Sequence, residues 1–292
     1  MLQHLIGTGV ALVTPFTANE EVDFDALGQL IDYVINGGVN YVVSLGTTGE
    51  TPVLDSAEQH DIVRFTVEKV AGRVPVVVGM GSNDTRALAK KITQFNWQGV
   101  TAILSASPYY NKPSQNGIVA HYEAVAKSTD LPILLYNVPG RTGRNMTAAT
   151  TLTLAEKYTN IAGIKEASGD MVQCMEIIKN APKNFLVVSG DDALASAQIA
   201  TGMQGVISVA ANCVPATFSA LVNASLQQQF SEAVSIQNKL LRLYDLLFIE
   251  NNPAGAKSLL AQKGIVQNIL RLPLTPLSKT YADELAAYVA MP

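Results

Sequence analysis

Charged residues are scarce in this chain of 292 residues: Lys, Arg, Asp and Glu make up 15% of it, and 48% is hydrophobic. A typical soluble protein has about 25% charged residues, and disorder requires low hydrophobicity together with high charge. The composition therefore excludes a disordered chain. It also predicts that part of the surface is buried between subunits, because an isolated monomer must cover itself with polar groups.

Cysteine and histidine are rare as well, and their positions limit the chemistry. Cys174 and Cys213 are too few for a disulfide framework, which favours reduced thiols and a cytoplasmic location. His4, His60 and His121 lie far apart without the spacing of metal ligands. We therefore expect no zinc or other metal site.

Concentrated charge and long apolar runs are also lacking. The net charge is −4 and the basic residues are scattered, unlike the basic patch of a nucleic-acid-binding protein. No apolar run reaches the 18 or so residues of a membrane span, and the first residues lack the pattern of a signal peptide. We expect a cytoplasmic protein that binds neither nucleic acid nor membrane.

What the chain has is one repeated pattern: a short β-branched run, a loop and an amphipathic stretch. Continuous apolar runs with little alternation indicate strands buried on both faces, as in a parallel sheet. Eight such runs lie at residues 9–15, 41–46, 74–81, 100–107, 131–138, 161–167, 185–190 and 205–210.

Helical patterns fill the intervals, at residues 23–37, 56–72, 84–99 and 147–158. The first opens at Asp23, a plausible N-cap, and stops at Gly37. The second begins at Ser56, with Gln59 at the spacing of a capping box. After residue 211 the β runs cease, and helical patterns continue through 216–229, 231–249, 252–263 and 279–290.

Eight βα units in one chain are typical of a (β/α)8 TIM barrel. The competing doubly wound sheet usually carries a glycine-rich phosphate loop after its first strand, where this chain has Thr14-Pro15-Phe16. We predict a barrel over residues 1–230, which carries the active site, and a C-terminal helical extension over residues 231–292.

Active sites of such barrels lie at the C-terminal ends of the strands, and there Lys165 is the most informative residue. It lies inside an apolar strand pattern, on the same face as Gly163, which would leave room for it. Burial favours the neutral amine, the nucleophile that forms a Schiff base with a carbonyl. The alternative is a structural ion pair with Glu166 or Glu50.

Other polar residues also follow strand ends. Tyr136 ends the preceding strand, about 4.8 Å away; it is either a general acid and base or a core tyrosine with its hydroxyl bonded to the backbone. Thr47 and Thr48 form either a carboxylate-binding turn or an ordinary one. Arg141 is either a bidentate carboxylate ligand or an exposed loop residue. Asp191-Asp192 is either a carboxylate pair or, for one of the two, a helix cap.

Six motifs together resemble the dihydrodipicolinate synthase family of pyruvate-dependent class I aldolases, (β/α)8 barrels with a helical extension. The similarity runs from about residue 5 to residue 276. The motifs are GTTGE at 46–50, SPYYNKPSQ at 107–115, YNVPGRTG at 136–143, GIKEASGD at 163–170, SGDD at 189–192 and GVISV at 205–209.

The resemblance implies that Lys165 forms a Schiff base with pyruvate, whose enamine attacks L-aspartate 4-semialdehyde to give 4-hydroxy-tetrahydrodipicolinate, in lysine and diaminopimelate biosynthesis. It implies that Tyr136 moves protons near the imine, and that Thr48 and Tyr110 complete a proton relay, with Tyr110 coming from a neighbouring subunit. It further implies a homo-oligomer, a tetramer built as a dimer of dimers, that uses no metal or organic cofactor.

The resemblance also assigns binding residues. Thr47 and Thr48 would hold the pyruvate carboxylate, and Arg141 the carboxylate of the semialdehyde. Gly190 and Ile207 would line the pocket near the lysine through their backbone carbonyls.

Two other functions compete with this one. One is a different pyruvate-dependent aldolase, such as N-acetylneuraminate lyase or a keto-deoxy sugar acid aldolase; Arg141 and the Thr47-Thr48 pair, which is usually Ser-Thr in the lyases, disfavour it. The other is a non-catalytic barrel that senses a keto acid, which would not need a complete proton relay.

Many members of the family are inhibited by L-lysine, and here this chain departs from the pattern. Ser56, Gln59 and Ala87 replace the histidines and the glutamate of lysine-sensitive members, whereas Asn83 and Tyr109 remain. We expect weak inhibition or none.

Overall fold

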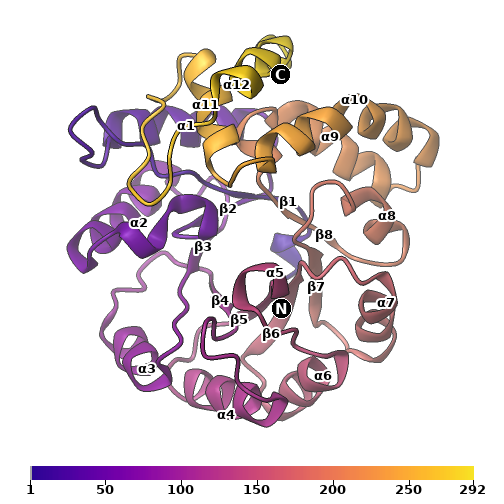
Figure 1. The fold of residues 1–292 in the computed structure, drawn as a ribbon. Helices are drawn as coiled ribbons and strands as arrows, with labels where there is room; N and C mark the ends of the chain where they lie inside the picture. Colours follow the sequence, from indigo (N-terminus) through magenta and orange to yellow (C-terminus); the bar gives the residue numbers. More distant parts are fainter. Residues whose placement is uncertain (1) are drawn as a thin grey trace.

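The computed structural model describes residues 2–292 and shows a closed barrel of eight parallel strands, paired in chain order from β1 to β8 (Figure 1). The predicted (β/α)8 barrel is thereby confirmed. The strands are β1 (Gly7–Ala11), β2 (Tyr41–Ser44), β3 (Val76–Gly79), β4 (Ala102–Ala106), β5 (Ile133–Asn137), β6 (Ile161–Glu166), β7 (Leu186–Ser189) and β8 (Gly205–Ser208).

Each predicted run contains a strand, but the first strand lies earlier than expected. The prediction was 9–15, and β1 ends at Ala11. Leu12 N still donates to Val43 O of β2, whereas Val13 N donates to the Asn212 side chain. The chain leaves the sheet at Val13, because the backbone N–H of this residue bonds to a side chain and not to a neighbouring strand.

Glycine closes the barrel where its first and last strands meet. Gly7 pairs with Gly205, and a Cβ on Gly205 would lie 2.1 Å from Gly7 O. Gly205 also has a φ of +152°, which other residues rarely adopt. The close backbone approach at this seam therefore depends on glycine.

Helices surround the barrel, and those of the extension lie together on one side of it (Figure 1). The barrel helices are α1 (Phe24–Asn36), α2 (Ser56–Val70), α3 (Thr85–Gln94), α4 (Gln115–Ala126), α5 (Pro139–Thr142), α6 (Ala148–Lys157), α7 (Met171–Asn180), α8 (Ala195–Ala200) and α9 (Pro215–Leu226). The extension contains α10 (Phe230–Phe248), α11 (Ala254–Gln262) and α12 (Lys279–Leu285).

Two predicted helix starts can be checked against the hydrogen bonds. Asp23 caps α1 as expected, accepting from Ala26 N. α2 begins at Ser56 as predicted, but the capping box lies one residue earlier than expected: its N-cap is Asp55, not Ser56, and it is closed by Glu58, not Gln59. The spacing was right, but the carboxylates of Asp55 and Glu58 take the two cap positions, and the Gln59 side chain turns inward.

The hydrophobic core has two parts. One lies inside the barrel and includes Leu104, Leu134, Val188 and Ile207. The other lies between strands and helices and continues without interruption into the extension. The division of the chain near residue 230 stays a prediction. Among residues 2–292, every helix is too short or too polar to span a bilayer.

Candidate active site

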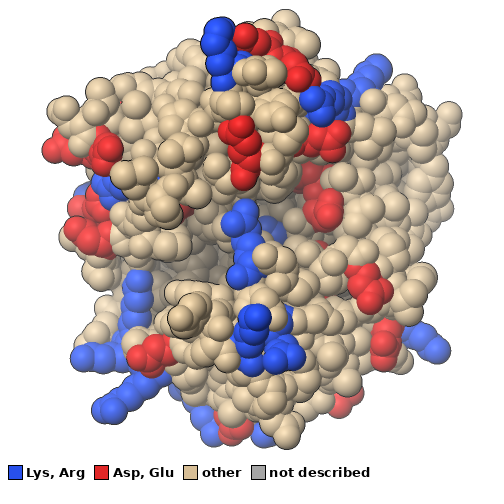
Figure 2. Space-filling model, in the orientation of Figure 1, with Lys and Arg blue, Asp and Glu red and all other residues tan. Residues whose placement is uncertain are grey.

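Lys165 and Tyr136 lie side by side at the C-terminal ends of β6 and β5. The strand register pairs the two residues directly, and the Lys165 Nζ lies 4.5 Å from the centroid of the Tyr136 ring. Lys165 is 5% exposed and Tyr136 is 7% exposed. An amine and a phenol are thus held together in a nearly closed site at the barrel mouth. Figure 2 shows this face hollowed near its centre, with basic side chains at the edge of the hollow.

The structural alternative for Lys165, an ion pair with Glu166 or Glu50, is wrong. The Glu166 carboxylate accepts from the side chains of Asn137 and Gln173 at 3.0–3.1 Å. Glu50 pairs with Lys257 instead. Because both carboxylates are engaged elsewhere, neither holds the Lys165 ammonium in a salt bridge, and the amine is available to a carbonyl ligand.

The alternative for Tyr136, a core tyrosine bonded to the backbone, is also wrong. Tyr122 has that role, and its hydroxyl donates to Ser105 O at 2.7 Å. Within residues 2–292, the Tyr136 hydroxyl forms no such bond, although its ring is buried. The hydroxyl can therefore exchange a proton with a ligand on Lys165.

The glycine that makes room for Lys165 is Gly190, not Gly163 as expected. A Cβ on Gly190 would lie 2.9 Å from the Lys165 Cε and 2.6 Å from the Ala167 Cβ. The space above Gly163 is taken by Leu134 and the backbone of β7. Gly163 does face the barrel interior, as predicted, but its missing side chain leaves space for Leu134 and Leu186. The end of β7 is what leaves the lysine its room.

The turn after β2 brings Thr47 and Thr48 to the same end of the barrel. It forms a short 3₁₀ helix (Thr47–Gly49), and Thr14 Oγ1 donates to Gly49 O at 2.7 Å. The Thr48 side chain is buried, and its hydroxyl accepts from Asn252 Nδ2 at 3.0 Å. This bond leaves the Thr48 hydroxyl proton free to be donated to another acceptor.

Ile207 lies on β8 inside the barrel, buried and paired with Gly9 of β1. The backbone N–H of Gly190 donates to Glu166 O at 2.7 Å, which joins the end of β7 to the end of β6. Gly190 thus lies directly beside Lys165, and Ile207 lies near the end of β8.

Arg141 and Tyr110 stand apart from this cluster. Arg141 lies on the short α5, directly after β5, and its side chain is exposed. Tyr110 is 88% exposed and lies in a loop with a φ of +71°. The Tyr110 ring is thus not enclosed by the chain to which it belongs.

Asp191 and Asp192 do not form a carboxylate pair. Asp191 accepts from the backbone N–H groups of Ala193 and Leu194, in the turn that leads into α8. Asp192 accepts from Val209 N and Ala210 N after β8, and burial raises the pKa of its carboxyl to about 6. Both residues hold loops at the barrel mouth. Neither caps α8, whose N-cap is Leu194 without a side-chain hydrogen bond, so the expected helix cap is wrong.

Sequence reasoning missed the contribution of the extension to this end of the barrel. Asn252 reaches Thr48, Lys257 reaches Glu50, and Arg271 N donates to Glu50 Oε2 at 3.2 Å. One signal was present: Lys257 lies inside the apolar run AGAKSLLA, at 254–261, just as Lys165 lies inside a strand run. A charged residue in an apolar run needs a buried partner.

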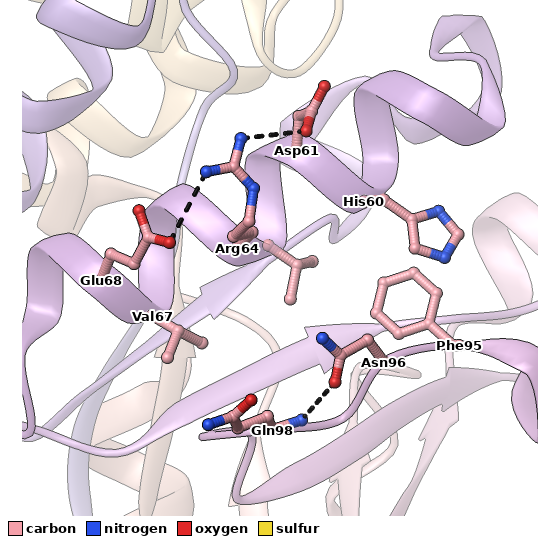
Figure 3. A pocket seen from close by; sticks show the side chains of 9 residues that line it. His60, Asp61, Arg64, Val67, Glu68, Phe95, Asn96 and Gln98 are labelled. Atoms are coloured by element: carbon pink, nitrogen blue, oxygen red, sulfur yellow. Dashed lines mark hydrogen bonds and ion pairs between the residues drawn. The ribbon is translucent and has the colours of Figure 1, made fainter.

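A cavity of about 270 Å³ on the outer wall of the barrel contains none of the predicted site residues (Figure 3). It lies between α2 and the segment after α3, where His60 stacks on Phe95 and Arg64 bridges Asp61 and Glu68. Arg64 is thus paired with both carboxylates of the lining. Among residues 2–292, no three His, Cys, Asp or Glu side chains gather to hold a metal ion.

The chain is similar to known proteins over nearly its whole length. The family model described as the dihydrodipicolinate synthetase family matches residues 4–291. A 4-hydroxy-tetrahydrodipicolinate synthase of Parabacteroides distasonis is 50% identical over 273 residues, which cover 94% of this chain and 92% of that protein.

Solved structures give the same result. A chloride-inhibited dihydrodipicolinate synthase from Acinetobacter baumannii, complexed with pyruvate, superposes with a TM-score of 0.94 at 35% identity and covers 99% of this chain and 100% of its own. A monomeric dihydrodipicolinate synthase variant has a TM-score of 0.95 at 36% identity, covering 99% and 98% of the two chains.

Proposed function

Because this chain belongs to the dihydrodipicolinate synthetase family, we propose that it is a lyase that condenses pyruvate with L-aspartate 4-semialdehyde. The product is 4-hydroxy-tetrahydrodipicolinate, an intermediate of lysine and diaminopimelate biosynthesis. The observation that carries the proposal is the buried amine of Lys165 against the ring of Tyr136, with neither Glu50 nor Glu166 paired to it. A Schiff-base mechanism needs a nucleophilic amine of this kind.

The first stage joins pyruvate to the enzyme. The neutral Lys165 amine attacks the pyruvate ketone, and the resulting carbinolamine loses water to become an imine. Tyr136 supplies the proton that the departing hydroxyl needs and later accepts one from the methyl group, so the imine becomes an enamine. The iminium nitrogen takes up the electron pair, and the chain needs no organic cofactor for this step.

The second stage forms the new carbon–carbon bond. The enamine carbon attacks the aldehyde of the semialdehyde, whose oxygen takes a proton from the relay of Tyr136, Thr48 and Tyr110. The amino group of the second substrate then attacks the imine carbon, displaces the Lys165 amine and closes the ring. The lysine is thereby free for the next turnover.

Two carboxylates must be held in place for these steps. The hydroxyls and backbone N–H groups of Thr47 and Thr48 bind the pyruvate carboxylate, and the exposed guanidinium of Arg141 binds that of the semialdehyde. Gly190 and Ile207 line the pocket around Lys165 with their carbonyls. The second carboxylate is the feature that separates this substrate pair from a sugar acid.

We further propose a homotetramer built as a dimer of dimers, in the cytoplasm. The exposed Tyr110 ring supports an interface near the active site. On α7, the exposed side chains of Val172 and Met175 form a second apolar surface. Cys174 and Cys213 are both unpaired and buried, in keeping with a reducing compartment.

The decisive experiment is trapping with borohydride. Pyruvate plus borohydride is expected to add a covalent group at Lys165 alone, as located by peptide mass mapping, and Lys165→Met should abolish the label. The trapped enzyme should be inactive in a condensation assay with aspartate semialdehyde. A label on another lysine would contradict the mechanism, and cleavage of N-acetylneuraminate in place of condensation would favour the sugar acid aldolases.

A further inference from the structure

A completely buried ion pair connects the turn after β2 to the C-terminal extension. Glu50 directly follows the Thr47–Gly49 turn, and Lys257 lies on α11. Their side chains are both 0% exposed, with Lys257 Nζ 2.5 Å from Glu50 Oε1. No other ion pair among residues 2–292 is closed off from solvent in this way, since the side chains of all the others are at least 17% exposed.

The surroundings make Lys257 the main counter-ion of Glu50. Lys257 Nζ also donates to Ile269 O at 2.8 Å and lies 4.1 Å from the centroid of the Phe16 ring. Arg271 donates its backbone N–H to Glu50, and its guanidinium is paired with Glu58. The Glu50 carboxylate therefore depends on Lys257 for its balance of charge.

Stability alone does not account for such a pair. Removing two charges from water costs about as much as their attraction returns, and apolar replacements of buried pairs are often equally stable. What a buried pair adds is a single allowed geometry, because neither charge can move away from the other without a large cost. The geometry fixed here is that of the turn: Glu50 has a φ of +54°, an uncommon conformation for glutamate.

We propose that Glu50 and Lys257 are positioning residues for the pyruvate carboxylate. They hold the Thr47–Thr48 turn in the conformation that binds this carboxylate. The proposal rests on the proposed function. The proposal assigns neither side chain a contact with the substrate, because the two charged groups are engaged with each other and both side chains are 0% exposed. They act through the turn, together with the bond from Asn252 to Thr48 and that from Thr14 to Gly49. The extension is therefore a part of the active site.

The test uses four variants and measures pyruvate binding without the second substrate. The readout is the pyruvate concentration that gives half-maximal borohydride trapping at Lys165, compared with the KM for aspartate semialdehyde. Lys257→Met and Glu50→Gln each leave the remaining buried residue of the pair without its ion-pair partner. Glu50→Asp keeps the negative charge but moves the carboxylate away from Lys257, because the side chain is shorter. The double variant Glu50→Gln/Lys257→Met removes both charges.

We expect each neutralising single variant to raise the half-maximal pyruvate concentration about tenfold or more, because an unpaired buried charge pulls its loop toward water. Glu50→Asp should give a smaller rise, and the double variant should recover most of the loss. The KM for the semialdehyde should change much less. The control is Lys279→Met, which breaks the exposed pair with Asp283 on α12 and should leave pyruvate binding unchanged.

Two results would overturn the proposal. One is a lowered melting temperature with unchanged pyruvate binding, which would make the pair purely structural. The other is an equal rise for both substrates, which would indicate general damage. If the single variants do not fold, Glu50→Asp and the double variant decide by the same criteria. If the unaltered enzyme traps no pyruvate, the proposed function has failed, and the failure is visible before any variant is made.

Discussion

At the scale of single residues, the site depends on what surrounds Lys165 as much as on the lysine itself. Both carboxylates that the sequence offered as its partners are bonded to other groups, and the missing side chain of Gly190 leaves space for its methylene chain. The Lys165 amine therefore lies beside the Tyr136 ring, and neither Glu50 nor Glu166 forms an ion pair with it.

Gly190→Ala should therefore lower kcat by about 100-fold, since a displacement of about 1 Å at a reacting group has an effect of that size. The added Cβ would meet Lys165 Cε at 2.9 Å. Steady-state kinetics and the rate of borohydride trapping check this together. Gly140→Ala is the matched control at the barrel mouth, because a Cβ there meets nothing within 4 Å. Equal activities in the two variants would show that Lys165 does not need this space.

His121 should make the protein sensitive to acid. Burial lowers its pKa to about 4; its Nδ1 bonds Thr85 Oγ1 at 2.8 Å, and its Nε2 has no partner within residues 2–292. The unfolded chain therefore binds a proton near pH 6.5, before the folded one does, so stability falls as the pH drops from about 6.5 to about 4.

The expected loss is roughly 3 kcal/mol at pH 4 relative to pH 7. Urea unfolding of the parent and of His121→Gln across this range measures it. The difference in unfolding free energy between the two proteins should shrink, or reverse in favour of the variant, as the pH falls. If the unfolding free energies of the two proteins change with pH in parallel, the pKa of His121 does not differ between the folded and unfolded states.

At the scale of elements, α2 and α3 show how neighbouring helices decide regulation. Gln59 on α2 is buried, and its amide donates to Leu54 O at 2.8 Å. Lys91 on α3 donates to its carbonyl oxygen, and burial lowers the pKa of that lysine. A cationic side chain thus occupies the neighbourhood in which lysine-sensitive relatives place histidines, and Ala87 offers no acceptor.

L-lysine should consequently inhibit weakly or not at all. Its ammonium groups need acceptors, and an unpaired buried charge costs several kcal/mol. The measurement is an inhibition titration at saturating pyruvate, with half-inhibition expected above about 1 mM, a binding energy of some 4 kcal/mol. A lower value would show that Asn83, Tyr109 and other acceptors form a site despite these replacements.

At the scale of the whole molecule, the proposed relay draws Tyr110 from a second chain. Tyr110 is 88% exposed, which fits a hydroxyl that joins Thr48 and Tyr136 of a neighbouring subunit. The catalytic unit would then be a pair of chains, and the low charge of the sequence fits a surface that is covered by a second copy.

Complementation between inactive variants tests this. Tyr110→Phe and Lys165→Ala should each be nearly inactive, and co-expression should restore about a quarter of the parent activity, since half of the dimers are mixed and each mixed dimer has one intact site. Sedimentation must show the same oligomer for both variants. No recovery in mixed dimers would place Tyr110 in its own subunit's site or outside the relay.

The sequence by itself determined the barrel and its reactive pair. Eight apolar runs with intervening helices specify parallel strands buried on both faces, and their order places Tyr136 and Lys165 on adjacent strands. These inferences succeed because they depend on local patterns and on the chain order, both of which can be read directly from the residues.

Only the tertiary structure decided which groups support that pair. Asn252 and Lys257 lie about 200 residues from Thr48 and Glu50 in the chain, yet they contact them, and no periodicity specifies such a contact. The choice of Gly190 rather than Gly163 as the neighbour of the Lys165 side chain has the same origin. The direction in which a side chain leaves its strand follows from alternation, whereas the atoms it meets depend on how distant segments pack together.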